Sequence, residues 1–195
     1  MDSPKRLVLA SQSPRRASLL RQIGLSFDIV PSHISEVHIA DHQPSEIVVA
    51  LSQAKAREVA LGVSDAIIIG ADTIVVLDGT ILGKPESPAE AIAMLKQLSG
   101  REHEVYTGFT LLETPGMREL STFEKTLVRF RTLQEREIAD YVASGSPMDK
   151  AGAYGIQDDY GAVFVESITG CFYNVVGFPL TKFYTMLQKF TGRST

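Results

Sequence analysis

Apolar residues follow two different spacings along this chain. At 7–10 and 66–69 they form short continuous runs, which are typical of buried strands. Elsewhere, as at Leu19, Leu20 and Ile23, they recur every three or four positions, which is typical of a helix with one buried face. Because the two patterns alternate, the sequence predicts an α/β fold with a mixed central sheet flanked by helices. The predicted strands are 7–10, 27–30, 66–69, 73–77, 80–82, 104–113, 119–130 and 162–165.

Residues at the ends of the predicted helices support their placement. Ser13 is suited to an N-cap and Pro14 to the first helical position, and a glycine follows where that helix should end. Ser87-Pro88-Ala89-Glu90 has the spacing of a capping box, which Thr132 to Glu135 repeats. Asp78-Gly79 indicates a tight hairpin. The predicted helices run from Ser13 to Gly24, from about Ser45 to Leu61, from Ser87 to Gly100, from Thr132 through Tyr141, and from Pro179 onward.

Composition bounds the class of protein. The chain has 195 residues, of which 44% are hydrophobic and 22% charged, so we expect one domain over 1–195, folded as two lobes around a cleft. A net charge of −4 argues against a large nucleic-acid footprint. No apolar run reaches the roughly 20 residues of a membrane span, and the N-terminus does not resemble a signal peptide. We therefore expect a cytoplasmic protein, with its single cysteine, Cys171, reduced and in the core.

The hexapeptide Ser11-Gln12-Ser13-Pro14-Arg15-Arg16 places two arginines where the first strand turns into the first helix. Cationic side chains in a first helical turn oppose the positive end of the helix dipole, at a cost of roughly 0.3–1 kcal/mol each. A bound anion reverses that sign, because backbone N–H groups, hydroxyls and guanidinium groups then converge on it. The hexapeptide therefore predicts a phosphate site. The alternative is an ordinary capped helix whose arginines are solvated.

Asp72 and two lysines are the next candidates. Asp72 follows a run of isoleucines in Gly70-Ala71-Asp72-Thr73, so the pattern places its carboxylate at the end of a buried strand. There it can hold a divalent metal or accept a proton from an attacking water, or it caps the following turn. Lys84 adds a cation on the rigid loop Gly83-Lys84-Pro85. Lys55 lies among alanines on a helix, where it reaches a phosphate or is solvated like most lysines.

Two polar segments carry the remaining candidates. Glu36 lies in a loop after the second predicted strand, where an acidic group can reach a metal. The segment 144–157 is rich in glycine and small residues, which favours a recognition loop. Its Gln157 offers a donor and an acceptor to the edge of uracil or thymine, and Tyr154 can pack beside the base. The alternative for this segment is a tight turn with a packed tyrosine.

Five motifs in a fixed order carry a resemblance that covers nearly the whole chain. Together they resemble the Maf family of nucleoside triphosphate pyrophosphatases, whose fold is of the Maf and ITPase type with a phosphate-binding cleft. The resemblance implies hydrolysis of a nucleoside triphosphate to the monophosphate and pyrophosphate, with a divalent cation, Mg²⁺ or Mn²⁺, as cofactor. It also implies a homodimer. The motifs lie at 11–16, 70–73, 83–85, 149–157 and 174–180.

The resemblance assigns a role to each candidate residue. Asp72 would be the proton acceptor that activates water, and Glu36 and Asp72 would hold the metal. Three positions separate a dTTP/UTP-type subgroup from one that takes methylated guanosine triphosphate. Here they are Arg15, Thr73 and Gln157, the residues of the dTTP/UTP subgroup, which implies canonical or modified pyrimidine nucleotides as substrates. The residues expected to bind phosphate are Ser11, Arg15, Arg16, Lys55 and Lys84.

Two other functions stay open. One is a house-cleaning pyrophosphatase for ITP or XTP, although Gln157 and Thr73 favour a pyrimidine. The other is a regulator of septum formation that acts by binding. The acidic net charge and the absence of a basic stripe argue against direct binding to DNA. The expected partner is therefore a nucleoside triphosphate, with neither nucleic acid nor membrane.

Overall fold

The computed structural model of this chain describes residues 5–34, 42–157 and 160–192. Its strands are β1 (Arg6–Ala10), β2 (Asp28–Ile29), β3 (Ala66–Leu77), β4 (Thr80–Leu82), β5 (Glu102–Glu113), β6 (Arg118–Phe130) and β7 (Val165–Thr169). Neighbouring strands are hydrogen-bonded in the order β2-β1-β3-β5-β6-β7, and β4 pairs with β3. β1 is parallel to β2 and β3, whereas β4 is antiparallel to β3 and β7 to β6. The predicted mixed sheet is confirmed.

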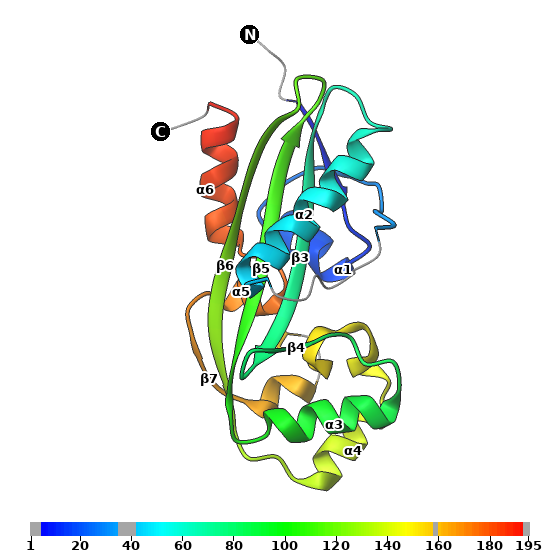
Figure 1. Cartoon of the computed structure of the whole chain (residues 1–195), viewed down its shortest axis with the longest axis vertical. Coiled ribbons are helices and arrows are strands. Elements are labelled where there is room, and N and C mark those ends of the chain that lie inside the picture. Colours follow the sequence, from blue (N-terminus) through cyan, green and yellow to red (C-terminus); the bar gives the residue numbers. More distant parts are fainter. Residues whose placement is uncertain (1–4, 35–41, 158–159, 193–195) are drawn as a thin grey trace. The chain divides into compact units, whose positions relative to one another are not determined.

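The chain forms two compact units. Unit 1 consists of Met1–Asp72, Thr107–Glu124 and Gly177–Thr195, and unit 2 of Thr73–Tyr106 and Lys125–Val176. The helices of unit 1 are α1 (Pro14–Gln22), α2 (Pro44–Ala60) and α6 (Leu180–Phe190) (Figure 1). Those of unit 2 are α3 (Pro88–Leu98), α4 (Glu135–Ala143), α5 (Phe172–Val176) and the 3-10 helices η1 (Ser146–Asp149), η2 (Ala151–Ala153) and η3 (Tyr160–Phe164). Because the boundary falls within β3, β5 and β6, these strands contribute to both units. The expectation of a single domain with a cleft stays a prediction.

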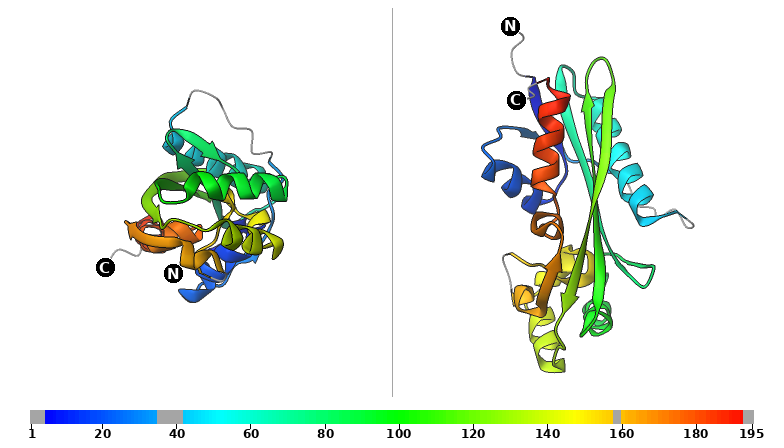
Figure 2. Two further views of the ribbon diagram at one scale, coloured as in Figure 1. Left: turned by 90° about the horizontal axis from the view of Figure 1, so that it is seen from below. Right: turned by 90° about the vertical axis from the view of Figure 1, so that its left-hand side faces the viewer.

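In unit 1, helices cover both faces of the sheet. α2 lies on one face, and α1 and α6 lie on the other (Figure 2). Side chains alternate between the faces along a strand. Ile68 of β3 therefore packs in a buried cluster with Ala56 of α2. On the opposite face, the ring of Phe109 from β5 lies 5.8 Å from that of Phe178 and 5.7 Å from that of Phe183 on α6.

Unit 2 is built on an aromatic core. α3 and α4 lie side by side (Figure 1). Phe130 of β6 lies against Phe164, with ring centroids 6.0 Å apart, and against Tyr154, at 4.7 Å. Tyr141 of α4 meets the other side of Phe164 at 5.2 Å. Each of these rings is less than 9% exposed, so Tyr154 and the end of η3 are anchored by side-chain packing. Among the described residues, no helix has the length and apolar character to cross a bilayer.

The predicted strands are largely confirmed, with two corrections. The strands predicted at 66–69 and 73–77 form one strand, β3, because the residues between them stay extended. The strand predicted at 162–165 is wrong. Residues 160–164 form η3, which turns Phe164 into the core, and the strand β7 begins only at Val165.

The helices predicted from Ser13, Ser45, Ser87 and Pro179 are confirmed, and the remaining one begins later than predicted. Gln134 is the N-cap of α4, and its N–H donates to the carboxylate of Glu137 at 2.9 Å. The capping box is therefore shifted two residues from the spacing that Thr132 suggested. Cys171, predicted in the core, is instead partly exposed, because it lies in the connection between β7 and α5.

Candidate active site

The turn from β1 into α1 is organised by two serine hydroxyls. The Oγ of Ser13 accepts from the N–H of Arg16 at 3.4 Å and caps α1, as the sequence predicted. Ser11 is 7% exposed, and its Oγ accepts from the N–H of Ser13 at 3.2 Å. Pro14 occupies the first helical position and has no N–H to satisfy. The turn therefore presents a helix N-terminus directly after a buried parallel strand.

The two arginines of the turn behave differently. Arg15 is partly exposed, whereas Arg16 is 9% exposed. The Nη1 of Arg16 donates to the Oγ of Ser11 at 3.2 Å and to the carbonyl of Ala71 at 2.9 Å, and its Nε donates to the carbonyl of Gly177 at 3.1 Å. The guanidinium group thus ties α1 to β3 and to the chain that leads into α6. The solvated alternative is wrong for Arg16, whose contact with phosphate stays a prediction.

Lys55 and Asp72 form a buried ion pair. The Nζ of Lys55 lies 2.6 Å from the Oδ1 of Asp72, and the two residues are 8% and 4% exposed. The solvated alternative for Lys55 is therefore wrong. A buried carboxylate is stable only with a counter-charge and hydrogen-bond donors. Lys55 supplies both from α2, so the pair fixes the orientation of the carboxylate before any substrate binds.

Two glycines allow α2 to lie close enough for this contact. A Cβ on Gly70 would lie 2.1 Å from the carbonyl oxygen of Ser52, and one on Gly108 would lie 2.3 Å from that of Val48. The backbone of α2 therefore rests directly on β3 and β5, which only glycine permits. Lys55 follows Ser52 by three residues, so it lies on the same face of the helix. In this way a close helix–sheet contact places the ammonium group on the sheet.

Asp72 does not end a strand, contrary to the sequence prediction. It lies within β3, but the parallel ladder with β1 stops at the pair Ala10 and Gly70. Asp72 is thus two residues beyond the carboxyl end of β1, where the chain turns toward α1. Because side chains alternate, Asp72 shares with Gly70 the face that α2 covers. The predicted strand boundary is therefore wrong. Asp72 nevertheless lies near the carboxyl end of the neighbouring parallel strand β1, and ligands of α/β sheets collect at such strand ends.

Unit 2 contains three further residues predicted for the site. Lys84 is exposed, whereas Thr73 and Gln157 are partly buried. The carbonyl of Gly83 accepts from the N–H of Gly152 at 3.0 Å, which joins the loop of Lys84 to the segment that leads to Gln157. The Oε1 of Gln157 is buried and has no hydrogen-bond partner among the residues that the structure describes. Its amide therefore has an acceptor that this described part of the chain leaves unused.

Tyr154 is part of the core, and the histidine that holds it was missed by the sequence reasoning. Its side chain is 6% exposed, and its hydroxyl lies 2.7 Å from the Nε2 of His103. The interpretation of Tyr154 as a stacking partner for a base is wrong, and the alternative of a packed tyrosine is confirmed. Burial lowers the pKa of His103 to about 4, so the imidazole is neutral at pH 7. An isolated histidine on a strand gives no pattern by which it could have been found.

The predicted metal ligands are only partly described by the structure. Glu36 lies outside the described residues. Within 5–34, 42–157 and 160–192, no group of three or more His, Cys, Asp or Glu side chains is arranged to hold a metal. Asp72 is the predicted ligand that the structure does place, with Lys55 on its Oδ1.

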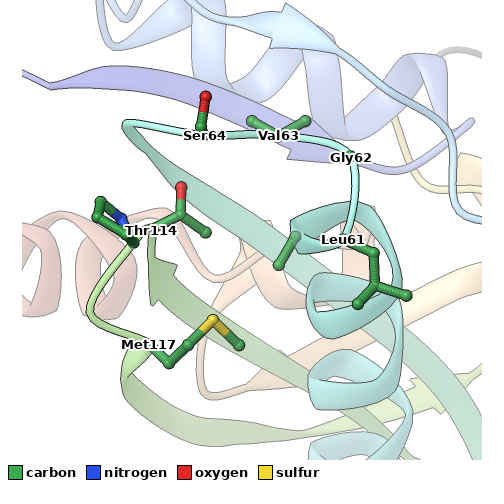
Figure 3. A pocket seen from close by; sticks show the side chains of 8 residues that line it. Leu61, Gly62, Val63, Ser64, Thr114 and Met117 are labelled. Carbon is green, nitrogen blue, oxygen red and sulfur yellow. The ribbon is translucent and has the colours of Figure 1, made fainter.

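A pocket elsewhere in unit 1 does not suit phosphate chemistry. Figure 3 shows it between the end of α2 and the turn that joins β5 and β6. Its volume is about 500 Å³, and no predicted site residue lines it. The lining lacks any titratable side chain, and Leu61 and Met117 give it an apolar character. The lining residues are Ala60, Leu61, Gly62, Val63, Ser64, Thr114, Pro115 and Met117.

Comparison with known proteins identifies the family. Residues 6–190 match the family model described as Maf-like protein. The chain belongs to the Maf family. Among relatives named dTTP/UTP pyrophosphatase, the one from Caldicellulosiruptor saccharolyticus is 49% identical, over 95% of this chain and 94% of its own length. Those from Carboxydothermus hydrogenoformans and Moorella thermoacetica are 48% and 51% identical, over 94% and 95% of this chain and 98% and 95% of their own lengths.

The structure joins some of the residues to which the Maf resemblance gave a role. In this Maf protein, Lys55 contacts Asp72, and Arg16 contacts Ser11. These four residues and Arg15 belong to unit 1, whereas Thr73, Lys84 and Gln157 belong to unit 2. The charged groups suited to phosphate and proton chemistry are therefore concentrated in unit 1, and the amide suited to a base lies in unit 2.

Proposed function

We propose that this chain hydrolyses dTTP and UTP to the nucleoside monophosphate and pyrophosphate. The observation that carries the chemistry is the buried Lys55–Asp72 pair, placed beside the N-terminus of α1. The choice of substrate is supported by the names of relatives that are 45–51% identical over 94–95% of the chain.

Asp72 is the group that takes a proton from the attacking water. As the water oxygen forms a bond to the α-phosphorus, the bond from that phosphorus to the oxygen that bridges to the β-phosphate breaks, and pyrophosphate leaves. The proton lost by the water passes to the carboxylate of Asp72. Lys55 holds that carboxylate at 2.6 Å, so the base keeps its orientation through the reaction.

The triphosphate is bound by cations and by the N-terminus of α1. Arg15, Lys55 and Lys84 neutralise its charge, which is greatest on the leaving pyrophosphate, and the hydroxyl of Ser11 donates to a phosphate oxygen. The backbone N–H groups at the start of α1 add an anion site. Arg16 also binds a phosphate oxygen in this proposal, and its Nη1 and Nε hold Ser11, β3 and the chain before α6 in place around it.

The pyrimidine is read by Gln157, with Arg15 and Thr73. Within the described part of the chain, the Oε1 of Gln157 is buried without a hydrogen-bond partner. The N3–H of uracil or thymine is a donor that satisfies this acceptor, whereas N3 of cytosine carries no proton. An unpaired buried acceptor costs about 1–3 kcal/mol, which favours UTP over CTP by about 5- to 160-fold.

A divalent cation is the cofactor in this proposal. Mg²⁺ is usually bound through one or two carboxylates together with substrate phosphates, and Asp72 fits that mode, with Glu36 as the second carboxylate. When bound, the cation polarises the α-phosphate and offsets its charge. Removal of divalent cations with EDTA should abolish turnover, and addition of Mg²⁺ or Mn²⁺ should restore it. Activity that persists in EDTA would remove the metal from the proposal. A cytoplasmic location and a homodimer stay predictions.

The decisive experiment measures pyrophosphate release from dTTP, UTP, CTP, ITP, XTP and 7-methyl-GTP, with the nucleotide product identified. We expect dTTP and UTP to be the preferred substrates and the monophosphate to be the product. Preference for ITP or XTP would keep the chemistry of unit 1 and overturn the role of Gln157. A lack of turnover with every nucleotide would overturn the enzyme assignment and favour a regulator that acts by binding.

A further inference from the structure

The segment from Ala151 to Gln157 is a strained connection that needs an anchor. Gly152 and Ala153 both have positive φ angles, of 67° and 61°. Glycine adopts that conformation without penalty, but alanine does not. Such a backbone persists only when its surroundings hold it in place. Ala153 is fully buried, so those surroundings are the core of unit 2.

The next residue, Tyr154, supplies a side-chain anchor. Its ring lies edge-on against Phe130 and His103, with centroid distances of 4.7 Å and 5.3 Å. Its hydroxyl lies 2.7 Å from the Nε2 of His103 on β5. Backbone contacts are added on either side, since Gly152 donates to the carbonyl of Gly83 at 3.0 Å and Gly155 donates to the hydroxyl of Tyr141 at 3.3 Å.

The bond between His103 and Tyr154 contributes little to stability. His103 is 2% exposed, and its buried Nδ1 has no hydrogen-bond partner in residues 5–34, 42–157 and 160–192. A buried atom of this kind offsets most of what one hydrogen bond contributes, and an apolar pair of the same shape would be nearly neutral. An apolar pair would not fix the position of the tyrosine hydroxyl. The hydrogen bond to His103 does fix it, whereas apolar contact alone lets the ring shift.

We infer that His103 is a positioning residue for recognition of the pyrimidine. It holds the hydroxyl of Tyr154 and thereby fixes the strained backbone that presents the amide of Gln157. Gln157 follows Tyr154 by only three positions, a span of at most about 10 Å, so a shift of the tyrosine is passed to the amide. This inference rests on the proposed role of Gln157.

The test uses three variants: Tyr154→Phe, His103→Leu and the two combined. Each should raise the KM for dTTP by about fivefold, the effect of one lost hydrogen bond, with kcat within about twofold. The ratio of kcat/KM for dTTP to that for CTP should fall by a similar factor. The double variant should show the same loss as either single one, because all three break one contact. Thermal unfolding checks that each variant is folded.

Two further variants serve as controls. Tyr106→Phe removes a hydroxyl that donates to Glu104 at 2.8 Å, also in unit 2 but outside the segment, and should change neither KM nor selectivity. His103→Gln places an amide nitrogen near the position of Nε2 and should recover part of the selectivity. Because Tyr154→Phe is a minimal change, the test stands even if His103→Leu does not fold.

The result that overturns the inference is an unchanged KM and dTTP/CTP ratio in folded Tyr154→Phe. An equal fall in kcat/KM for every nucleotide would also overturn the inference, since it would indicate a general disturbance of the fold and not a loss of base selectivity. Gln157→Ala separates this failure from failure of the proposed function. If Gln157→Ala lowers selectivity and Tyr154→Phe does not, only the role of His103 fails. If Gln157→Ala also leaves selectivity intact, pyrimidine recognition by this segment fails with it.

Discussion

The two units each contain a buried polar pair, and the pairs differ in charge and in what they hold. In unit 1, Lys55 of α2 and Asp72 of β3 form an ion pair, with the Nζ and the Oδ1 2.6 Å apart. In unit 2, His103 and Tyr154 form a neutral pair 2.7 Å apart. A buried ion pair needs both partners, because the loss of either leaves an uncompensated charge. A neutral pair can be replaced by apolar side chains at little cost to stability.

This difference indicates two uses for buried polarity. The charged pair orients a carboxylate in the core, which suits a proton acceptor. The neutral pair of His103 and Tyr154 places no charge in the core. In our inference it holds the segment from Ala151 to Gln157 in position. Removing single groups should therefore affect chemistry and stability in unit 1, and selectivity and pH dependence in unit 2.

The largest effect is expected from Asp72→Asn. The amide cannot accept the proton, so kcat with dTTP should fall by about 10²- to 10⁴-fold, the usual contribution of a general base. Binding of dTTP, measured by calorimetry, should persist. Asp78→Asn is the matched control, since Asp78 is an exposed carboxylate on the β3–β4 hairpin, and its kcat should stay within about twofold. Near wild-type turnover in Asp72→Asn would show that another group is the base.

Lys55→Met should have the next largest effect, on stability. It removes the ammonium group that lies 2.6 Å from the buried carboxylate of Asp72, so the free energy of unfolding should fall by about 3–5 kcal/mol, measured by urea titration. Adding Asp72→Leu should recover most of that loss, because the buried carboxylate is then removed as well. Lys96→Met removes an exposed lysine that pairs with Glu135 at 2.6 Å and should change stability little. A similar small effect at Lys55 would mean that the pair is solvated.

Gly70→Ala tests whether close helix packing creates the charged pair. Its Cβ would lie 2.1 Å from the carbonyl of Ser52, so α2 must move away from β3. We expect a loss of about 3 kcal/mol in the free energy of unfolding, together with a large loss of kcat as Lys55 leaves Asp72. Gly62→Ala is the matched control. A Cβ there meets nothing within 4 Å, so stability should change by less than about 0.5 kcal/mol. Equal effects of the two substitutions would contradict the packing argument.

These contacts also show which features of the fold and the candidate site could be predicted from the sequence alone. Apolar spacing and capping residues place most elements, because they depend on neighbours in the chain. Asp72 could be chosen as a candidate from the isoleucines before it, but the sequence does not show that β3 continues past Asp72 after the ladder with β1 ends at Gly70. The pairing of Lys55 with Asp72 depends on Gly70 and Gly108, which permit α2 to touch both β3 and β5. A glycine in a strand predicts a close approach, but it does not name the partner.

Unit 2 was the less predictable of the two. Gly-rich composition indicated a loop at 144–157, but the burial of Tyr154 depends on His103, about fifty positions away on β5. The two residues share no local pattern. The charged residues paired in unit 1 could thus be named as candidates from the sequence, whereas the anchoring of the segment that carries Gln157 required the structure.

The smallest of these effects is the pH dependence that His103 should confer. Its pKa is about 4 in the folded chain and 6.5 when unfolded, so between these values the unfolded chain binds more protons. The contribution of neutral His103 to the free energy of unfolding is fully present above pH 6.5 and is lost progressively as the pH falls toward 4. At pH 5 the free energy of unfolding should be about 2 kcal/mol lower than at pH 7 from this group alone. His103→Leu/Tyr154→Phe lacks the titrating group, so the difference between its pH profile and that of the wild type isolates His103. Parallel profiles would mean that the imidazole is hydrated or charged at neutral pH, and the contrast between a charged and a neutral pair would then fail.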